Sequence, residues 1–289
     1  STATAVLDKI RLRVSAKEFP FVVGRVSFFV NAGIKFISEI CKMRAFVELW
    51  HEICFTKYGV KEEKLRRFRY GVQVNSLGLT EQQPENNVYR ILLELLAVTL
   101  SKNARARAIQ LPAWNEAMGL PRPWDQQWSL RMQQVLAYET DLLEYEDIFD
   151  QNPIIEKKVK RILREVNLKV EKIDKMGGTV AALDYMKRAL VSSNAKRLSK
   201  IESGETIVVG VNKFTTSEES GLSLGEGDSV QVVDKQIEKI QISSLIDWRS
   251  KRNNNLVEKA KDNLKDAARK KINIMTASIE AAKAGVTTG

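Results

Sequence analysis

The sequence predicts an α/β fold in which parallel strands alternate with helices, and three strand-like runs carry this prediction. They are FPFVVGRVSFFV at 19–30, RFRYGVQVNSL at 67–77 and ARARAIQL at 104–111, each rich in aromatic, β-branched or alternating apolar residues. A helix-like segment follows each run, so successive strands are joined by crossovers and run parallel. Because a closed (β/α)₈ barrel needs eight strands, the pattern fits either a small open sheet or part of a barrel.

The connecting helices are predicted from the spacing of their apolar residues. Residues 3–14 form the end of one amphipathic helix, and residues 34–57 form a second that ends at Tyr58 and Gly59. A third begins at Pro84, where the missing proline N–H costs nothing. The apolar positions of the second helix are Phe36, Ile37, Ile40, Met43, Val47, Trp50 and Cys54, and those of the third are Val88, Ile91, Leu92, Leu95, Leu96 and Leu100.

The character of the chain changes after residue 146. Residues 152–205 have the composition of helices, with a break at the Gly-Gly pair 177–178, and residues 206–214 are predicted as one more short strand. A polar, Gly- and Ser-rich loop is expected at 215–235, and charged helices at 236–285. We therefore divide the chain into an α/β segment, 1–146, and a helical extension, 147–289.

The formal net charge of +10 is compatible with three classes of partner: nucleic acid, an anionic membrane or a phosphate-bearing ligand. In IIEKKVKRILREVNLKVEKIDK (154–175), however, Lys and Arg alternate with acidic and aliphatic residues at helical spacing, which indicates a solvated helix face. Aromatic interleaving, zinc-finger motifs and RNP-like motifs are absent, so no nucleic-acid partner is expected. Charge interrupts every apolar stretch before the length of a membrane span, and the first residues lack the apolar core of a signal peptide.

Cysteine and histidine usage argues against metal and nucleophilic sites. Cys41 and Cys54 form no CxxC pair and suit buried thiols in a reduced, cytoplasmic compartment. The single histidine, His51, lies within a predicted helix and has no Cys or Asp cluster around it, so no zinc site is expected. The chain has no G-x-S-x-G elbow, phosphate-binding glycine motif or evident carboxylate pair. If the chain is part of an enzyme, a cofactor or another segment must carry the hard chemistry.

Polar side chains occur at the predicted strand ends, where parallel α/β sheets carry function. Arg25 and Ser27 are two residues apart and share a face of the first strand, and such a pair can hold a phosphate, carboxylate or thioester carbonyl. The alternative is that Arg25 is a strand-end charge in water. At the second strand, Gln73 and Asn75 share a face beside Ser76 and offer neutral amides, which suit a large polar ligand better than proton transfer.

The third predicted strand end combines basic, polar and aromatic residues. Its polar members are Arg105, Arg107, Gln110, Asn115 and Glu116, and the surrounding aromatics are Trp114, Trp124 and Trp128. Tryptophans this dense either pack in the core or form the walls of a ligand cavity, and the pattern leaves both interpretations open.

Four segments of the first half are long enough to be specific: VGRVSFFVNAG, CKMRAFVELW, RRFRYGVQVNSLGLTEQQPENNVYR and ARAIQLPAWNEAMGLPRPWDQQWS. Together with MGGTVAAL and IVVGVNKF further along, they closely resemble the large catalytic chain of coenzyme B12-dependent acyl-CoA mutases, the methylmalonyl-CoA mutase family. Within the family the chain resembles the ethylmalonyl-CoA mutase branch. Gly71 stands where the methylmalonyl-CoA branch typically has His, and 74–77 read Val-Asn-Ser-Leu where that branch has Thr-Ser-Gly-Trp.

The resemblance implies a fold and an activity. Residues 1–146 would be the C-terminal part of a (β/α)₈ TIM barrel, about strands six to eight, which holds the CoA chain along its axis. A separate flavodoxin-like domain presents adenosylcobalamin to the barrel mouth. The implied reaction is a radical carbon-skeleton isomerisation of an acyl-CoA, from ethylmalonyl-CoA to methylsuccinyl-CoA or from methylmalonyl-CoA to succinyl-CoA, in which the protein orients the radicals and seals them from water.

Two groups of residues match family positions that contact ligands. The group implied to contact acyl-CoA is Arg25, Val26, Ser27 and Gln73. The group implied to contact the corrin is Ser76, Glu116 and Gly119. The Arg25 guanidinium can pair with a CoA phosphate, and the Glu116 carboxylate can accept hydrogen bonds from corrin amides. Gln73 faces the same space and can contact either ligand.

The first five barrel strands of the family and its cobalt-ligating Asp-x-His-x-x-Gly motif have no counterpart in this sequence. The Tyr, Arg and His that grip the substrate belong to that part, so no catalytic or metal-binding residue is expected on this chain. The remaining barrel and the cobalamin domain are expected on a longer polypeptide or on partner chains, and the complete enzyme as a dimer. The alternative is a catalytically incomplete half-barrel that acts as an assembly or regulatory partner.

Overall fold

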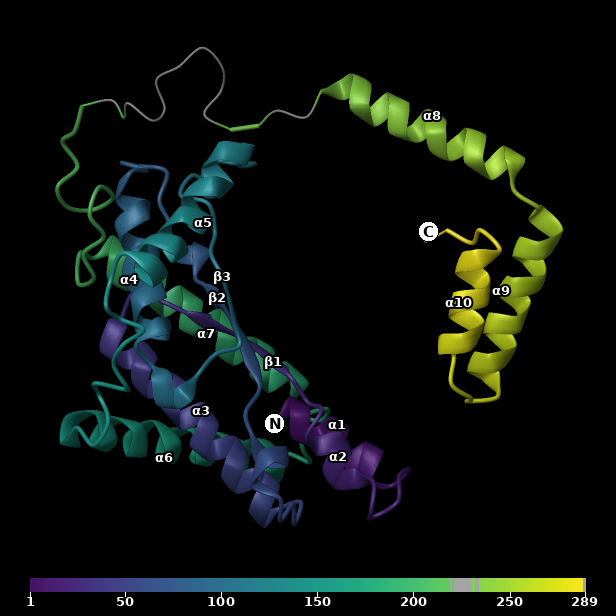
Figure 1. Cartoon of the computed structure of the whole chain (residues 1–289), viewed down its shortest axis with the longest axis horizontal. Coiled ribbons are helices and arrows are strands. Elements are labelled where there is room, and N and C mark those ends of the chain that lie inside the picture. Colours follow the sequence, from purple (N-terminus) through teal and green to yellow (C-terminus); the bar gives the residue numbers. More distant parts are fainter. Residues whose placement is uncertain (219, 221–229, 232–233, 288–289) are drawn as a thin grey trace. The chain divides into compact units, whose positions relative to one another are not determined.

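The computed structural model describes residues 1–218, 220, 230–231 and 234–287. The chain forms two compact units, Ser1–Gln231 and Val232–Gly289 (Figure 1). The first unit contains a β-sheet and the helices α1 to α7, and the second contains α8 to α10. The expected division of the chain into an α/β segment, 1–146, and a helical extension, 147–289, does not refer to these two units and stays a prediction.

The sheet consists of β1 (Phe28–Ala32), β2 (Tyr70–Val74) and β3 (Ala108–Gln110), in the order β1-β2-β3. Both pairs are parallel, which confirms the predicted α/β class with crossover connections. The register places Phe29 beside Gly71 and Gly71 beside Ala108. Side chains with the same parity on the three strands therefore form rows across one face of the sheet.

One face of the sheet is covered by α3 (Phe36–Thr56) and α4 (Asn86–Thr99) (Figure 1). Met43, Trp50 and Cys54 of α3 pack in the same core cluster as Val72. The strand residues on this covered face are Phe28, Val30, Ala32, Tyr70, Val72, Val74 and Ile109. Both helices were predicted from their apolar stripes, and in the structure these stripes pack against the covered face of the sheet.

The opposite face of the sheet, here called the open face, consists of Phe29, Asn31, Gly71, Gln73, Ala108 and Gln110. No described helix covers it, and Phe29 remains 61% exposed. In a (β/α)₈ barrel the helices lie outside, so a face without helices is what the expected partial barrel would turn toward its interior.

The predicted strand at 19–30 is wrong over its first half. Phe19–Val23 form a short helix, α2, and the chain turns at Gly24 before β1 begins at Phe28. Pro20 is tolerated in the first helical turn, and Phe19 and Val23 lie four residues apart, which lets both be buried on one side of a helix. The apolar composition that predicted a strand serves helix packing here.

The other two strands are shorter than predicted, and short 3₁₀ turns flank them. These turns are η1 (Glu63–Arg66), η2 (Ser76–Gly78) and η3 (Lys102–Ala104). The expected first helix is α1 (Thr2–Arg11), and the helix expected after the Trp-rich segment is α5 (Pro123–Tyr138).

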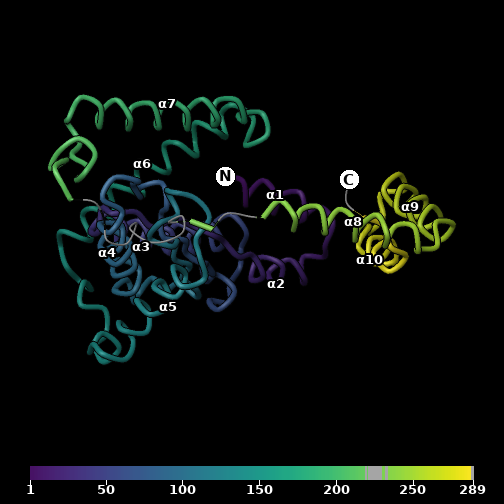
Figure 2. The backbone as a smooth tube through the Cα atoms, turned by 90° about the horizontal axis from the view of Figure 1, so that it is seen from above, coloured from purple at the N-terminus to yellow at the C-terminus, as the bar shows by residue number. Residues whose placement is uncertain are grey.

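The helical region after residue 146 begins with α6 (Pro153–Lys175), which packs against α3. The predicted break at Gly177 and Gly178 separates α6 from α7 (Leu183–Glu202). In Figure 2, α6 and α7 lie on one side of the other helices of this unit.

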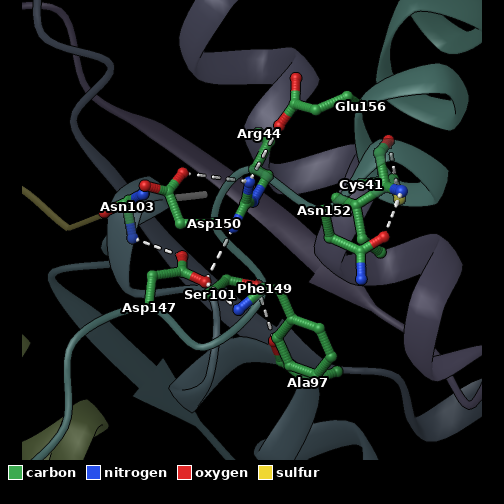
Figure 3. A network of polar contacts seen from close by, with 11 residues as sticks. Cys41, Arg44, Ala97, Ser101, Asn103, Asp147, Phe149, Asp150, Asn152 and Glu156 are labelled. Carbon is green, nitrogen blue, oxygen red and sulfur yellow. Dashed lines mark hydrogen bonds and ion pairs between the residues drawn. The ribbon is translucent and has the colours of Figure 1, made fainter.

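A buried ionic network fastens this region to α3 (Figure 3). The Arg44 guanidinium is 2.8 Å from Asp147 and 3.3 Å from Glu156 at the start of α6. The second Asp147 carboxylate oxygen accepts a hydrogen bond from the backbone N–H of Asn103, 2.8 Å away. Arg44 and Asp147 are each only 7% exposed, so the network joins three distant segments at a site shielded from water.

The predicted strand at 206–214 is also wrong. The segment is a tight loop with a single isolated bridge between Val209 and Lys213. The Asn212 side chain accepts a hydrogen bond from Val208 N–H and donates to the carbonyl oxygens of Ile201 and Thr206, which closes the loop on itself. Side-chain bonds of this kind compete with strand pairing.

The second unit contains α8 (Lys235–Lys251), α9 (Asn254–Arg269) and α10 (Met275–Lys283), as expected for 236–285. Buried Val257, Ala260 and Ala267 of α9 and Ala281 of α10 lie where these two helices pack. Much of the loop expected at 215–235 lies outside the described residues; 215–218 have no regular structure. Within the described part of the chain, no helix is long and apolar enough to cross a membrane.

Candidate functional site

Arg25 and Ser27 lie at the amino end of β1, which corrects the expectation that they follow a strand. Because residues 19–23 are helical, Arg25 belongs to the turn after α2, and β1 starts only after Ser27. The two side chains are exposed, whereas Val26 between them packs against the core. Arg25 and Ser27 therefore share the exposed side, as predicted from their spacing.

Arginines precede all three strands. We define the amino edge as Arg25, Ser27, Arg67, Arg69, Arg105 and Arg107. Arg105 and Arg107 precede β3, which corrects their assignment to a carboxyl end. Phe28 N–H donates to Arg69 O at 2.9 Å, and Arg107 N–H donates to Tyr70 O at 2.8 Å. The segments that lead into the three strands therefore run side by side. Arginine presents donors for phosphate and carboxylate, so this edge is suited to an anionic group.

Two rows of contrasting chemistry cross the open face. Closer to the amino edge lies an apolar row, Phe29, Gly71 and Ala108. A Cβ at Gly71 would come within 3.1 Å of the Phe29 ring, so the glycine allows that ring to lie against β2. Closer to the carboxyl ends lies an amide row, Asn31, Gln73 and Gln110.

The loop after β2 begins with Asn75 and Ser76. Asn75 N–H continues the ladder by donating to Ala32 O at 2.8 Å, and its side-chain oxygen accepts from Leu77 N–H at 3.1 Å. This Asx-type turn fixes the backbone of Ser76 immediately beyond the strand. Leu77 next to it is 77% exposed, so the loop presents a largely uncovered surface at the carboxyl ends.

Glu94 supports this loop from behind and was not anticipated from the sequence. It lies on α4, is 2% exposed, and its Oε2 has no hydrogen-bond partner among the described residues. Burial, followed by the nearby Glu39 carboxylate, raises the Glu94 pKa to about 8, although Asn75 N–H and Arg90 oppose the shift. A glutamate within the apolar run LLELL was the available signal, because a helix stripe facing the core seldom contains an acid.

The segment after β3 is held by Asp125, which is fully buried. Burial alone would raise its pKa, but hydrogen bonds from Arg122 and Asn115 outweigh it and hold the pKa below the ordinary value. The Trp114 indole N–H also donates to Asp125, at 3.2 Å. These bonds fix the backbone on either side of Glu116.

Glu116 and Gly119 themselves are exposed beyond this anchor. Gly119 has a φ of +150°, a conformation that side chains with a Cβ rarely adopt. The carboxyl ends of β2 and β3 thus lead to Ser76, Glu116 and Gly119, which we call the carboxyl edge. Sequence reasoning placed these three residues beyond the strands, and they lie there.

The tryptophans favour core packing over cavity walls. Trp114 is 1% exposed, and its ring lies 6.3 Å and 6.5 Å from those of Trp124 and Trp128. Trp124 and Trp128, on α5, cover the outer side of this buried ring and remain partly exposed. Their contacts with one another account for their density in the sequence.

The described residues contain no group of three or more His, Cys, Asp or Glu side chains arranged to hold a metal ion. Cys41 and Cys54 are buried and free, and burial raises the pKa of both thiols. They therefore behave as packing residues rather than nucleophiles.

Comparison with known proteins identifies the family. The family model described as methylmalonyl-CoA mutase matches residues 15–289. The chain belongs to the methylmalonyl-CoA mutase family.

Individual relatives sharpen this assignment. The chain is 62% identical to ethylmalonyl-CoA mutase of Cereibacter sphaeroides over 289 residues, which is 100% of this chain and 44% of that protein. It is 58% identical to ethylmalonyl-CoA mutase of Methylorubrum extorquens, covering 99% of this chain and 42% of that protein. Identity to methylmalonyl-CoA mutase of Escherichia coli is 30%, over 92% of this chain and 36% of that protein. The predicted resemblance to the ethylmalonyl-CoA branch is confirmed, and the chain spans under half the length of these relatives.

Proposed function

We propose that the chain is part of an adenosylcobalamin-dependent acyl-CoA mutase that interconverts ethylmalonyl-CoA and methylsuccinyl-CoA, with methylmalonyl-CoA and succinyl-CoA as the alternative pair. The observation that carries the proposal is the order of chemistry along the strands. Arginines stand at the amino edge, an apolar row and an amide row follow on the open face, and Ser76 and Glu116 lie beyond the carboxyl ends.

This order matches an acyl-CoA extended along the strands. The CoA phosphates would pair with Arg25 and bond to the Ser27 hydroxyl, as the family resemblance implies, and Val26 would hold both residues by packing on the core. Five strand residues at about 3.3 Å each span about 16 Å, which is comparable to an extended pantetheine arm. The acyl thioester of a substrate held at the amino edge would then reach the carboxyl half of the open face.

The carboxyl edge suits the cofactor. A corrin ring is rimmed with amide groups, so the exposed Glu116 carboxylate can accept its N–H donors. Gly119, which the family resemblance implies is a corrin contact, lies beside Val230 in this chain. Adenosylcobalamin would supply the radical that starts the rearrangement. The residues of this chain would bind, orient and exclude water, and the cobalt ligand would come from outside it.

The fold supports an incomplete barrel. β1 and β3 each have one unpaired edge among the described strands, and such edges require covering. We assign these strands to positions six to eight of a (β/α)₈ barrel, with residues 1–146 as the ligand-facing segment and 147–289 as the helical extension. The remaining barrel and the cobalamin domain would lie on the same polypeptide or on partner chains, in a dimeric, cytoplasmic enzyme.

The test is to purify the native protein, measure the intact mass of every chain, and assay both isomerisations with adenosylcobalamin. Turnover of ethylmalonyl-CoA at a rate above methylmalonyl-CoA is the expected result. If only methylmalonyl-CoA is turned over, methylmalonyl-CoA takes the place of ethylmalonyl-CoA as the proposed substrate. A stable complex without cofactor-dependent turnover would reject the mutase and leave the role of an assembly partner.

A further inference from the structure

A cavity within the first unit lies between α4, α7 and the loop at 206–209. Its volume is about 860 Å³, and small-ligand pockets usually measure about 300–1,000 Å³. Asn75 and Leu77, from the loop after β2, also line it. No residue of the open face does, so the cavity is separate from the surface along which we place the acyl-CoA.

Hydrogen bonds hold the 206–214 loop against α4 and the turn that precedes it. The Arg90 guanidinium donates to the Val209 carbonyl oxygen at 2.8 Å, and the Gln83 side-chain amide donates to the Phe214 carbonyl oxygen at 2.8 Å. The same guanidinium donates to the Thr80 hydroxyl at 2.8 Å. One wall of the cavity is therefore a loop fixed by specific bonds to α4.

Glu94 supplies a buried polar group to this cavity. It belongs to the lining, and its Oε2 is a buried atom without a hydrogen-bond partner among the described residues. Leaving such an atom unsatisfied costs stability, which a ligand atom bonded to it would restore. Burial, followed by the Glu39 carboxylate, raises the Glu94 pKa to about 8 against the opposing effects of Asn75 N–H and Arg90. At neutral pH the carboxyl group is mainly protonated, so it presents an O–H donor beside an oxygen acceptor.

An adenine base has the complementary edge, a ring-nitrogen acceptor beside an amino N–H donor. Guanine instead presents a ring N–H and an amino N–H side by side, which match an ionised carboxylate. The apolar part of the lining includes Tyr89, Leu93 and Ile207, all exposed. Aromatic and aliphatic side chains of this kind offer a surface on which a flat base can pack.

The exposed part of the lining carries an excess of positive charge. It includes Lys35, Lys196, Arg197 and Lys200. Lys200 forms an ion pair with Glu205. Within the part of the chain that the structure describes, the ammonium groups of Lys35 and Lys196 have no ion-pair partner. These two amines are therefore available to an anionic group such as a phosphate.

We propose that this cavity binds a free adenine nucleotide, with the base edge on the Glu94 carboxyl group and the phosphate on Lys35 and Lys196. Because Asn75 and Leu77 belong to the lining, the bound nucleotide contacts the loop that presents Ser76 at the carboxyl edge. The proposal does not depend on the mutase activity.

The experiment is isothermal titration calorimetry of the native protein with AMP, adenosine and GMP. AMP should bind about tenfold tighter than GMP because of the base edge, and tighter than adenosine because of the phosphate. Glu94→Leu should weaken AMP binding by about tenfold, whereas Glu94→Gln should keep it, because an amide also offers a donor beside an acceptor. Lys196→Met should lower the affinity for AMP toward that for adenosine. Lys187→Met, at an exposed position of α7 outside the lining, is the matched control.

Saturating CoA should leave AMP binding unchanged, and displacement of AMP by CoA would overturn the proposal by placing the nucleotide in the CoA site. Equal affinities for AMP and GMP, or wild-type AMP affinity in Lys196→Met, would also overturn it. Absence of AMP binding would mean that the cavity is closed to nucleotides in the native protein. Circular dichroism reports whether Glu94→Leu is folded; if it is not, the GMP and Lys196→Met comparisons decide.

Discussion

Val72 and Gln73 are consecutive residues of β2, yet Val72 has no exposed surface and Gln73 faces a side of the sheet that no described helix covers. The covered face consists of aliphatic and aromatic side chains under α3 and α4, and its burial stabilises the unit. The open face contributes little burial and presents amides, a glycine and an exposed Phe29. The same strands therefore carry stability on one side and groups available to a ligand on the other.

The largest loss of stability is expected when the buried ion pairs of Arg44, which join α3 to the region around α6, are removed. Arg44→Met leaves the Asp147 carboxylate buried without its cation and should lower the free energy of unfolding by about 3–5 kcal/mol. Urea unfolding followed by circular dichroism measures the loss. Lys57→Met removes a half-exposed pair with Asp8 and should cost below about 1 kcal/mol. Equal losses in the two variants would contradict a special role for the Arg44 network.

A paired substitution tests the comparison directly. Leu95→Ala empties a buried position of α4 and should cost about 2–5 kcal/mol of unfolding free energy. Gln110→Ala on the open face should change it by at most about 0.5 kcal/mol, since Gln110 is exposed and makes no side-chain bond with a described residue. Thermal and urea unfolding of both variants supply the numbers. A comparable cost for Gln110→Ala would mean that the open face is structural.

The amino edge should show the reverse pattern, with function lost and stability kept. Arg25→Ala should weaken CoA binding by about tenfold or more, because a charge-assisted bond to phosphate is removed. Titration at low and high salt should also show a smaller salt dependence than in the wild type. Arg188→Ala, an exposed arginine of α7, is the control. Unchanged CoA affinity in Arg25→Ala would support the alternative that Arg25 is a solvated charge without a role in CoA binding.

The smallest effect is expected at Glu94, where the covered side meets the carboxyl-edge loop. Its pKa is about 8 in the folded chain against 4.5 for an ordinary glutamate, so between these values the folded state binds the extra proton. Stability is therefore lost as pH rises from about 4.5 to 8. Glu94→Gln should remove that slope and raise the unfolding free energy by about 1–2 kcal/mol at pH 8, with little change at pH 4.5. Parallel pH dependences in the two proteins would show that Glu94 is ionised when folded.

Much of this architecture could be predicted because local pattern and burial agree. The apolar spacing of 34–57 and of the helix after Pro84 indicated α3 and α4, and their covered face on the sheet confirms it. The failures occur at 19–23 and 206–214, where composition favours strands. In one, Phe19 and Val23 pack as a helix; in the other, Asn212 closes a loop through its side chain. Such outcomes depend on partners distant in sequence, which a local window does not contain.

The sequence by itself determined the α/β class, the parallel connections and the family, because these follow from periodicity and from long specific segments. It also named Arg25, Ser27, Gln73, Ser76 and Glu116 as candidates. Only the tertiary structure decided that Arg25 and Ser27 lie at the opposite end of the sheet from Ser76 and Glu116, and that Asn31, Gln73 and Gln110 form one row. Strand starts and register are set by pairing across the sheet, and a shift of one residue would send the side chains of Asn31, Gln73 and Gln110 to the other face.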